Sequence, residues 1–374
     1  MDALFVSADS HVLEPGDLWV KGLPQDCRAR APKVVTVDGK SSFVGEGMTD
    51  RPLSIAFAAG RRGDDMDYNN TVWENRPAAG SDLKARLEAQ DLDGVAGEVL
   101  YPTLGLNMFS LADPKLKREC ARAYNRWLGD LAKRSEGRLI AVGLLAVDDP
   151  STIEDDIREA VNEGCRAIMP PVVGAIPFNR EVYEPLWKTA EEMRLPVNFH
   201  IGAGGELMKA RGPGAAMINY MGTLEGLQNL AHTLIWSGLF VNHPGIKVGF
   251  IEAGIGWIAP LLEKLDDLWG QHGSWARPKL DKAPSEFFKS NCYATFERDH
   301  IGLDQRSRVG VKNLMWATDY PHAESSWPNS RAVAAEHFSG IPEEERNLIL
   351  SGNVLRLYNW DIAAARKSKP KSAA

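Results

Sequence analysis

The chain has 374 residues, of which 44% are hydrophobic and 25% are charged, and its formal net charge is −7. This composition is that of a globular protein with a large core, and the acidic balance excludes the basic surface with which proteins bind nucleic acid. No stretch approaches the roughly 20 uninterrupted apolar residues that cross a bilayer. The cysteines form no CxxC pair, which indicates reduced thiols in a cytoplasmic protein; they are Cys27, Cys120, Cys165 and Cys292.

The chain opens with an apolar stretch, residues 4–11 (LFVSADSH), which predicts a strand ending in an acid and an imidazole. Side chains two residues apart in a strand point to the same face, so Asp9 and His11 are predicted to project together. Such a pair supplies half of a metal site. Residues 14–80 are predicted to leave the core as an excursion, with a β-hairpin at Asp38-Gly39, a pair that suits a tight turn with positive φ.

From Ser81 the pattern becomes a regular alternation of helices and strands. Ser81 is predicted to cap a helix that ends at Asp93-Gly94, and Asp113-Pro114 to open a long helix. Eight strands, most of them separated by one helix, predict a single α/β domain over residues 1–374, a (β/α)8 TIM barrel, with 361–374 as a flexible tail. A doubly wound open sheet accepts a similar alternation. The predicted strands are 4–11, 95–101, 138–147, 165–170, 196–200, 247–252, 291–296 and 313–319.

Two later strands end in residues that would complete the metal site. His200 closes the fifth strand and Asp319 closes the eighth. In a closed barrel the first and eighth strands are neighbours, and barrel enzymes carry their chemistry at the carboxyl ends of the strands. Nitrogen and oxygen ligands with an open position suit Zn²⁺ or another divalent ion that acts on a bound water or a substrate oxygen. Taken singly, His200 has a structural alternative as a core histidine, and Asp319 as the start of a turn.

Other polar residues near strand ends are candidates for catalysis or substrate binding. Glu252, after the sixth strand, can act as a general base, as a structural acid, or as a group that orients the metal's ligands. His322 can bind substrate, orient the site or cap a loop. The run 297–299 (ERD) is either a set of substrate contacts or, as is more common, a solvated charge run. Four arginines of the excursion are candidates to grip a substrate carboxylate: Arg51, Arg61, Arg62 and Arg76.

Seven motifs together resemble the amidohydrolase-related family that includes aminocarboxymuconate-semialdehyde decarboxylase and the metal-dependent, non-oxidative aromatic-acid decarboxylases. They are ADSHVLEP, LYPTLG, ECARAYNRWL, YEPLWKTAEE, LPVNFHIG, HPGIKVGFIEAGIGW and ATDYPH. The resemblance covers nearly the whole chain and is specific to the family but not to one reaction. It implies that Asp9, His11, His200 and Asp319 bind the metal, with Zn²⁺ favoured and Mn²⁺ as the alternative. Because many relatives are dimers, it also implies a homodimer.

Two departures from the family pattern refine this expectation. Binuclear members of the wider superfamily carry a bridging Lys or Glu at the end of the fourth strand, where this chain has Met169-Pro170-Pro171, so one metal ion is expected. Many members carry a His at the end of the sixth strand, where this chain has Glu252.

Three functions therefore remain open on the sequence. The first is decarboxylation of a small aromatic or unsaturated cyclic carboxylic acid, with Asp319 managing the proton and His322 beside it. The second is hydrolysis of a lactone, cyclic amide or C–C acyl bond, with Asp319 or Glu252 as general base. The third is a barrel without catalysis that keeps the metal for stability.

Overall fold

The computed structural model describes residues 3–48, 51–53, 56–61, 72–204 and 209–362. Its centre is a parallel eight-stranded sheet whose spatial order follows the chain, β1-β5-β6-β7-β8-β9-β10-β11. The strands are β1 (Val6–His11), β5 (Gly97–Tyr101), β6 (Leu139–Leu144), β7 (Cys165–Met169), β8 (Val197–His200), β9 (Val248–Ile251), β10 (Cys292–Phe296) and β11 (Leu314–Trp316).

Hydrogen bonds between the ends of the first and last strands bring the sheet close to a closed cylinder. The Asp319 amide donates to the Asp9 carbonyl at 3.0 Å, and the His11 amide donates to the Tyr320 carbonyl at 2.7 Å. The predicted (β/α)8 barrel is thereby confirmed, because a doubly wound sheet would show a break in the sequential strand order. All six residues of β1 are buried, as expected for a strand with the barrel interior on one side and helices on the other.

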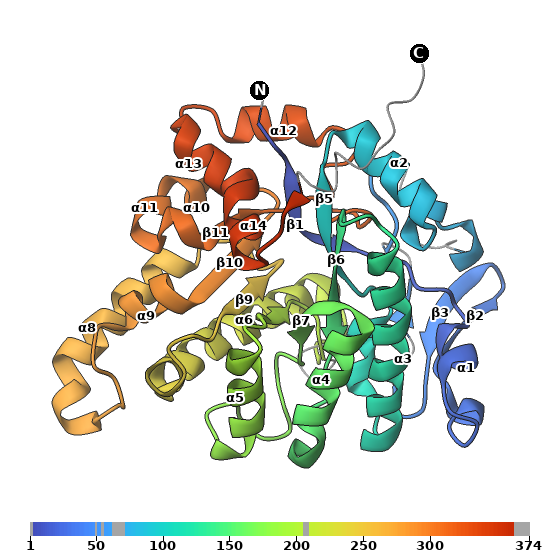
Figure 1. Ribbon diagram of the computed structural model, residues 1–374, viewed down its shortest axis with the longest axis horizontal. Helices are drawn as coiled ribbons and strands as arrows, with labels where there is room; N and C mark the ends of the chain where they lie inside the picture. The colour runs from blue at the N-terminus through green and yellow to red at the C-terminus, as the bar shows by residue number, and fades with distance from the viewer. Residues whose placement is uncertain (1–2, 49–50, 54–55, 62–71, 205–208, 363–374) are drawn as a thin grey trace.

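Helices surround the strands (Figure 1). The longest segments are α2 (Leu83–Asp93), α3 (Pro114–Lys133), α4 (Ile153–Glu163), α5 (Glu184–Glu192), α6 (Ala215–Trp236), α8 (Ile258–Ala276), α9 (Pro284–Asn291) and α12 (Ser330–His337). Shorter helices are α7 (Leu239–Asn242), α10 (His300–Asp304), α11 (Arg306–Val309), α13 (Glu343–Asn347) and α14 (Asn353–Leu357).

The ends of two early helices test the capping predictions. Asp113 caps α3 as predicted, because its side chain accepts hydrogen bonds from the amides of the first turn. The predicted cap of α2 is wrong by one residue: Asp82 accepts a hydrogen bond from the Ala85 amide at 2.8 Å. Ser81 instead closes the preceding turn, where its amide donates to the Ala78 carbonyl. Gly94 ends α2 in the left-handed conformation, with φ of 73°.

The excursion at 14–80 contains α1 (Leu18–Gly22) and a small antiparallel sheet of β2 (Lys33–Val37), β3 (Lys40–Val44) and β4 (Arg51–Pro52). The predicted hairpin is confirmed, since β2 and β3 pair through a turn in which Asp38 and Gly39 both have positive φ. The excursion lies against α3 (Figure 1), where the Trp19 indole donates to the Cys120 carbonyl at 3.0 Å. From residue 363 on, the predicted tail lies outside the described residues.

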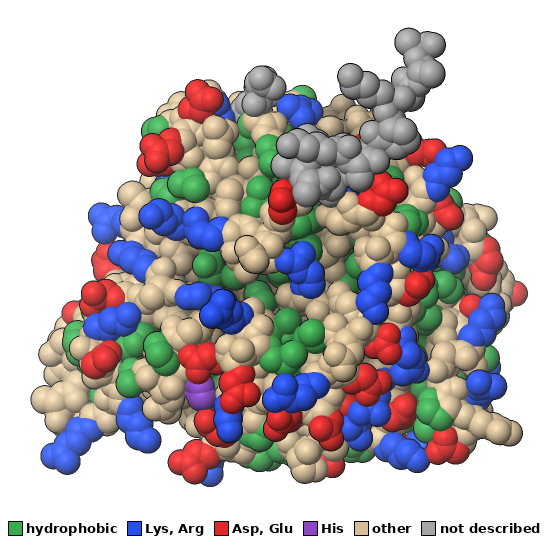
Figure 2. All heavy atoms as spheres, in the orientation of Figure 1, with side chains coloured by type: hydrophobic (Ala, Val, Ile, Leu, Met, Phe, Trp, Pro, Cys, Tyr) green, Lys and Arg blue, Asp and Glu red, His purple; other side chains and the backbone are tan. Residues whose placement is uncertain are grey.

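The surface carries charges of both signs. On the face that Figure 2 presents, Lys and Arg side chains alternate with Asp and Glu side chains, so neither sign forms a continuous field there. The four cysteines are buried and unpaired with one another. Among the described residues, every helix is too short or too polar to cross a membrane.

Candidate metal centre

The end of β1 is irregular, and the irregularity sets the position of Asp9. Ser7 pairs with Glu98 and Ser10 with Leu100, so β1 uses one residue more than β5 over this stretch. Such a bulge re-aims the side chain that it contains. Buried hydroxyl groups stabilise it: the Ser7 hydroxyl donates to the Asp9 carbonyl at 2.7 Å, and the Ser10 hydroxyl lies 2.8 Å from the Thr318 hydroxyl.

The two histidines of the site are oriented by backbone carbonyl groups. His11 Nδ1 lies 2.8 Å from the Pro102 carbonyl, and His200 Nδ1 lies 2.7 Å from the Ile201 carbonyl. A carbonyl only accepts, so each Nδ1 carries the hydrogen and each Nε2 keeps its lone pair. The two Nε2 atoms face each other at 3.2 Å. Two acceptors at this distance require a cation or a bridging donor between them, and a histidine oriented in this way is typical of metal ligands.

The two acids that follow later strands are held in left-handed backbone conformations. Glu252 has φ of 58° and Asp319 has φ of 54°, a region that residues other than glycine adopt uncommonly. The Glu252 amide donates to the Thr295 hydroxyl at 2.7 Å, and the Asp319 amide is held by the Asp9 carbonyl. The turn at Asp319 explains why β11 stops three residues before the predicted end of the eighth strand.

Four side chains from these strand ends lie within 3.6 Å of His11 Nε2. His11 Nε2 lies 3.6 Å from Asp9 Oδ1 and 3.4 Å from Asp319 Oδ1. Glu252 Oε2 lies 3.4 Å from His11 Nε2 and 3.2 Å from His200 Nε2. Ligands about 2.1 Å from a tetrahedral ion are about 3.4 Å from one another. These spacings fit a divalent cation. Two sets of residues are each compact enough to hold an ion, Asp9–His11–His200–Glu252 and His11–Glu252–Asp319–His322, and among the described residues no such set joins Asp319 to Asp9 and His200.

The acids of the centre lack other donors. Within the described part of the chain, neither oxygen of Asp9 and neither oxygen of Asp319 has a hydrogen-bond partner, although both side chains are fully buried. A buried carboxylate without a partner costs several kcal/mol, so these orphaned oxygens favour a bound cation. Residues of the centre therefore fit the metal ion that the sequence predicts.

Without such a cation, burial favours the protonated forms of Glu252 and Asp319. Burial, reinforced by Glu297 and Asp9, raises the pKa of Asp319 well above its usual range. Burial, reinforced by Asp319 and Asp9, raises the pKa of Glu252 in the same direction. A divalent cation acts oppositely on its ligands, because it stabilises their deprotonated forms.

The histidines are kept neutral by the same cause. Burial lowers the pKa of His11 well below its usual value, and the neighbouring His322 and His200 add to the effect. Burial lowers the pKa of His322 to about 4. His322 lies between two partners, with Nδ1 at 3.1 Å from Asp319 Oδ1 and Nε2 at 3.0 Å from the Thr103 hydroxyl. The contact with Asp319 lacks the geometry of a hydrogen bond, so it places a neutral imidazole beside this carboxyl group without satisfying it.

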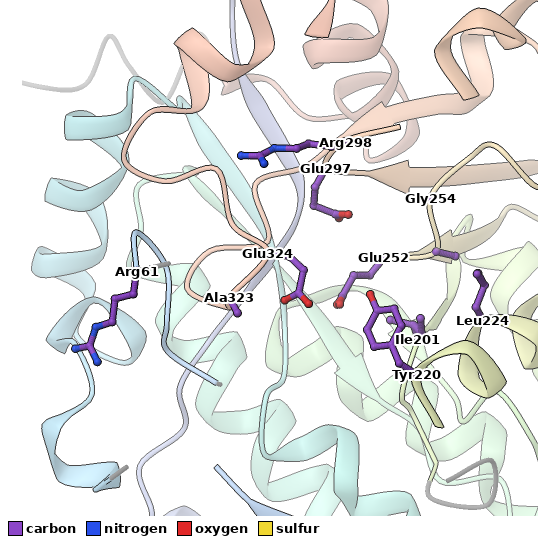
Figure 3. Close-up of a pocket in the computed structure, with 11 residues that line it drawn as sticks. Arg61, Ile201, Tyr220, Leu224, Glu252, Gly254, Glu297, Arg298, Ala323 and Glu324 are labelled. Carbon is purple, nitrogen blue, oxygen red and sulfur yellow. The ribbon is translucent and has the colours of Figure 1, made fainter. Parts of the chain in front are cut away.

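A pocket of about 520 Å³ opens beside the centre (Figure 3). Its apolar wall contains Ile201 and Leu224, with Tyr220 beside them. Three carboxylates, from Glu252, Glu297 and Glu324, also line the pocket. The described residues that line the pocket are Arg61, Ile201, Tyr220, Leu224, Glu252, Ala253, Gly254, Glu297, Arg298, Ala323 and Glu324.

The arginines proposed as a carboxylate grip are placed differently from one another. Arg61 lines the pocket. Arg76 is occupied elsewhere, since it donates to the Trp73 carbonyl at 3.1 Å and lies over the Trp73 ring. The side chain of Arg51 and all of Arg62 lie outside the described residues.

The run 297–299 is not the solvated charge run that the sequence favoured. Glu297 and Arg298 line the pocket. Asp299 is partly buried and accepts hydrogen bonds from the Ile255 and Gly256 amides, so it holds the loop that follows Glu252. The feature of the sequence that favoured a role at the site was that residues 297–299 directly follow the predicted seventh strand.

Sequence reasoning missed Glu14, which supports the centre from behind. Glu14 is fully buried, and its two oxygens accept hydrogen bonds from the Leu104 and Gly105 amides, each at 2.9 Å. The same loop supplies the Pro102 carbonyl that orients His11 and the Thr103 hydroxyl that contacts His322. In the sequence, the only indication of this role was the position of Glu14 directly after the apolar residues that follow His11.

Comparison with known proteins supports this description of the fold. The family model described as amidohydrolase matches residues 88–360. No curated protein matches the chain.

Three solved structures illustrate the likeness. An amidohydrolase from Mycobacterium avium subsp. paratuberculosis has a TM-score of 0.80 at 18% identity, covering 96% of this chain and 100% of its own. A 5-carboxyvanillate decarboxylase from Sphingomonas paucimobilis has a TM-score of 0.68 at 21% identity, with coverages of 96% and 100%. A dihydroxybenzoic acid decarboxylase from Polaromonas, solved with manganese and the inhibitor 2-nitroresorcinol, has a TM-score of 0.64 at 16% identity, with coverages of 96% and 97%.

Proposed function

The chain belongs to the amidohydrolase family, and from that premise we propose that it is a mononuclear metal enzyme that decarboxylates a small aromatic or unsaturated cyclic carboxylic acid. The observation that carries the proposal is the convergence of two imidazoles and three carboxylates beside a pocket of about 520 Å³. Its volume suits a single substituted ring. The decarboxylases among the structural neighbours support the choice of reaction.

In this proposal Asp9, His11, His200 and Asp319 hold the ion, with Zn²⁺ favoured and Mn²⁺ the alternative. When bound, the ion supplies positive charge for the carboxylate and hydroxyl oxygens of the substrate. The distances of Glu252 Oε2 from both imidazoles add this residue to the donor set, a role different from the general base that the sequence favoured. Elemental analysis of the purified protein identifies the ion.

Asp319 is the residue that we propose moves the proton. Once a proton from water reaches its buried carboxyl group, Asp319 passes that proton to the ring carbon that carries the substrate carboxylate. The electron pair of the breaking C–C bond forms the new C–H bond, carbon dioxide leaves, and Asp319 regains its proton from water. His322, held by the Thr103 hydroxyl, keeps the reacting oxygen of Asp319 in place.

Hydrolysis is the second candidate, and the position of Glu252 favours it. A carboxylate at 3.2 Å from His200 Nε2 can remove a proton from a water molecule that attacks a lactone, a cyclic amide or a C–C acyl bond. Glu252 stands at the position where the family resemblance leads one to expect a His, so this base would replace that His.

One assay separates the two reactions. Carbon dioxide release is measured over a set of hydroxybenzoates, and ring opening is measured over lactones and cyclic imides, with the metal-loaded protein in both. Decarboxylation predicts activity on the first set. Activity on the second set alone overturns it and selects hydrolysis.

The variant Asp319→Asn tests whether the barrel is catalytic at all. We expect turnover to fall by about 10² to 10⁴, the usual contribution of a positioned general acid or base, with circular dichroism unchanged. The matched control is Asp281→Asn, since Asp281 is exposed in a loop before α9. If metal affinity is the only property that Asp319→Asn changes, the protein is a metal-stabilised scaffold instead.

We also propose a homodimer, as the resemblance to the family implies. Light scattering at micromolar concentration checks this, and a monomeric mass contradicts it.

A further inference from the structure

The pocket wall that faces the metal centre is acidic, and its charge bears on what the substrate carries besides its reacting carboxylate. Among the described lining residues, Glu252, Glu297 and Glu324 supply carboxylates, and Arg61 and Arg298 supply guanidinium groups. In Figure 3 the three carboxylates point toward the middle of the pocket, whereas the two guanidinium groups point away from them. The arginines that line the pocket therefore leave its acidic wall without a facing positive charge.

Nothing else in the described part of the chain neutralises this wall. Glu297 and Glu324 take part in no ion pair there, and Glu297 Oε1 is buried without a hydrogen-bond partner. The deeper Asp319 is fully buried and likewise has no hydrogen bond to either oxygen. Buried carboxylate oxygens need donors, so Glu297 Oε1 and the Asp319 carboxylate are available to something that the pocket receives. Glu324 is exposed and adds a solvated carboxylate to the same lining.

A divalent ion accounts for only part of the negative charge. The carboxylates of Asp9, Asp319 and Glu252 lie around the ion's position and already exceed its charge of two. Glu297 and Glu324 are therefore in excess, and they are available to the remote part of the substrate rather than to the metal.

We propose that Glu297 and Glu324 bind an amino or hydroxyl group on the part of the substrate that is remote from the reacting carboxylate, and that they exclude substrates with a second carboxylate. This inference rests on the proposed function for the identity of the reacting group. An N–H or O–H that donates to a carboxylate forms one of the strong, charge-assisted hydrogen bonds. A second carboxylate would instead be repelled by the ionised glutamates, more strongly by Glu297, which is the less exposed of the two and is therefore less screened by water.

The neighbouring lining residues fit such a ring. Ile201 and Leu224 form an apolar wall beside Tyr220, and the Tyr220 hydroxyl is directed toward Glu252 in Figure 3. An aromatic ring packed on this wall would place its substituents toward Glu297 and Glu324 across the pocket. The apolar wall binds the ring, and the acidic wall selects among its substituents.

The test measures binding, so that it does not depend on turnover. Isothermal titration of the metal-loaded protein is carried out with matched pairs of ligands: 3-(aminomethyl)benzoate against benzene-1,3-dicarboxylate, and the corresponding 1,4-substituted pair. The members of each pair share one carboxylate and differ only in the charge of the remote group. The variants are Glu297→Gln and Glu324→Gln, which keep the shape of each side chain and remove its charge.

In the wild-type protein we expect the amine of at least one pair to bind about tenfold or more tightly than its dicarboxylate. Either glutamine variant should reduce that ratio about fivefold or more. The matched control is Glu263→Gln, the same change on an exposed side chain of α8, which is 78% accessible and distant from the pocket lining. It should leave the ratio unchanged. Metal content and circular dichroism establish that each variant is folded and loaded.

Three results overturn the inference: dicarboxylates that bind as tightly as amines, a ratio that neither glutamine variant changes, or no binding by any member of the pairs. Failure of the proposed function looks different. Selective binding of the amines without carbon dioxide release from any hydroxybenzoate removes the decarboxylase assignment and leaves the inference in place. Carbon dioxide release without this selectivity does the reverse.

Discussion

The two ends of the barrel each place histidine among carboxylates, and only one of them has the properties of a functional site. At the amino end, His243 lies before β9, with Nδ1 at 3.0 Å from Glu191 Oε2 and Nε2 at 3.2 Å from Glu184 Oε2. The other oxygen of Glu191 accepts a hydrogen bond from the Gly245 amide at 2.6 Å. Each of these groups has a partner of complementary character, so the cluster needs nothing further.

At the carboxyl end the same residue types are left incomplete. His11 and His200 direct their lone pairs at each other, and the oxygens of Asp9 and Asp319 have no donor among the described residues. Glu252 and Asp319 also hold unfavourable backbone conformations there. The difference shows that residue type and burial do not by themselves identify a site. Several unsatisfied carboxylates and imidazoles that face one another, two of them in a strained backbone, point to one.

The largest effect is expected from His200→Ala, and the comparison is tested by replacing one histidine at each end of the barrel. His200→Ala deletes an imidazole nitrogen that faces the metal position, so we expect metal affinity to fall by at least about 100-fold and turnover to be lost. His243→Ala should reduce stability by about 1–3 kcal/mol and leave the metal content unchanged. Elemental analysis after dialysis against a chelator and reloading checks both variants. Equal metal content in the two variants would contradict the comparison.

Much of the barrel and part of the centre could be predicted from the sequence, because both depend on local patterns. Apolar runs of strand length and the helices between them indicated the eight strands in order, and polar residues at the ends of those runs indicated Asp9, His11, His200 and Asp319. The structure brings these four together with Glu252. Their roles as ligands stay predictions that the variants above test.

What the sequence could not supply depends on contacts between distant segments. Glu14 matters because its oxygens meet the Leu104 and Gly105 amides, and no spacing within residues 11–15 indicates that meeting. Glu297 was weighed as part of a solvated charge run, because its burial comes from neighbouring loops. The N-cap of α2 was assigned to the wrong residue because Ser81 belongs to the preceding turn, where its amide donates to the Ala78 carbonyl.

A prediction of intermediate size concerns Glu14. Both of its carboxylate oxygens accept hydrogen bonds, whereas those of Asp9 and Asp319 have no donor among the described residues. Burial raises the pKa of Glu14 from 4.5 to about 7. The folded protein therefore holds this proton more tightly than the unfolded chain does, and the stabilisation is lost as the pH rises from about 4.5 to about 7. The free energy of unfolding lost over this pH window is about 3 kcal/mol.

Glu14→Gln removes that titration. We expect the free energy of unfolding of the metal-free variant to decline less with pH than that of the wild type, by about 3 kcal/mol over the window. Urea denaturation of both proteins at several pH values measures the difference, in which the other site carboxyls cancel because both proteins contain them. Glu263→Gln, on the exposed face of α8, is the control. Parallel curves for Glu14→Gln and the wild type would show that Glu14 is ionised throughout.

The smallest expected effect lies at the contact between Thr103 and His322. The Thr103 hydroxyl is 3.0 Å from His322 Nε2, while Nδ1 of the same ring keeps its contact with Asp319 Oδ1 at 3.1 Å. Thr103→Val therefore loosens the ring at one end only. We expect turnover to fall by about three- to tenfold, equivalent to roughly 1 kcal/mol, with metal content unchanged. Thr189→Val, a buried threonine of α5 on the outside of the barrel, is the matched control.

The loss of turnover in Thr103→Val shows whether His322 is a functional residue of the metal centre or a structural histidine. If Thr103→Val costs as much turnover as Asp319→Asn, the hydroxyl, the imidazole and the carboxyl act as one unit, and His322 belongs with the unsatisfied groups that do the chemistry. If turnover is unchanged, His322 is satisfied by Asp319 alone and is a structural histidine like His243. A loss between these limits indicates that His322 is a positioning residue. In Thr103→Val the His322 ring loses its contact with the hydroxyl but keeps its contact with Asp319 Oδ1, so the reacting oxygen is only partly displaced.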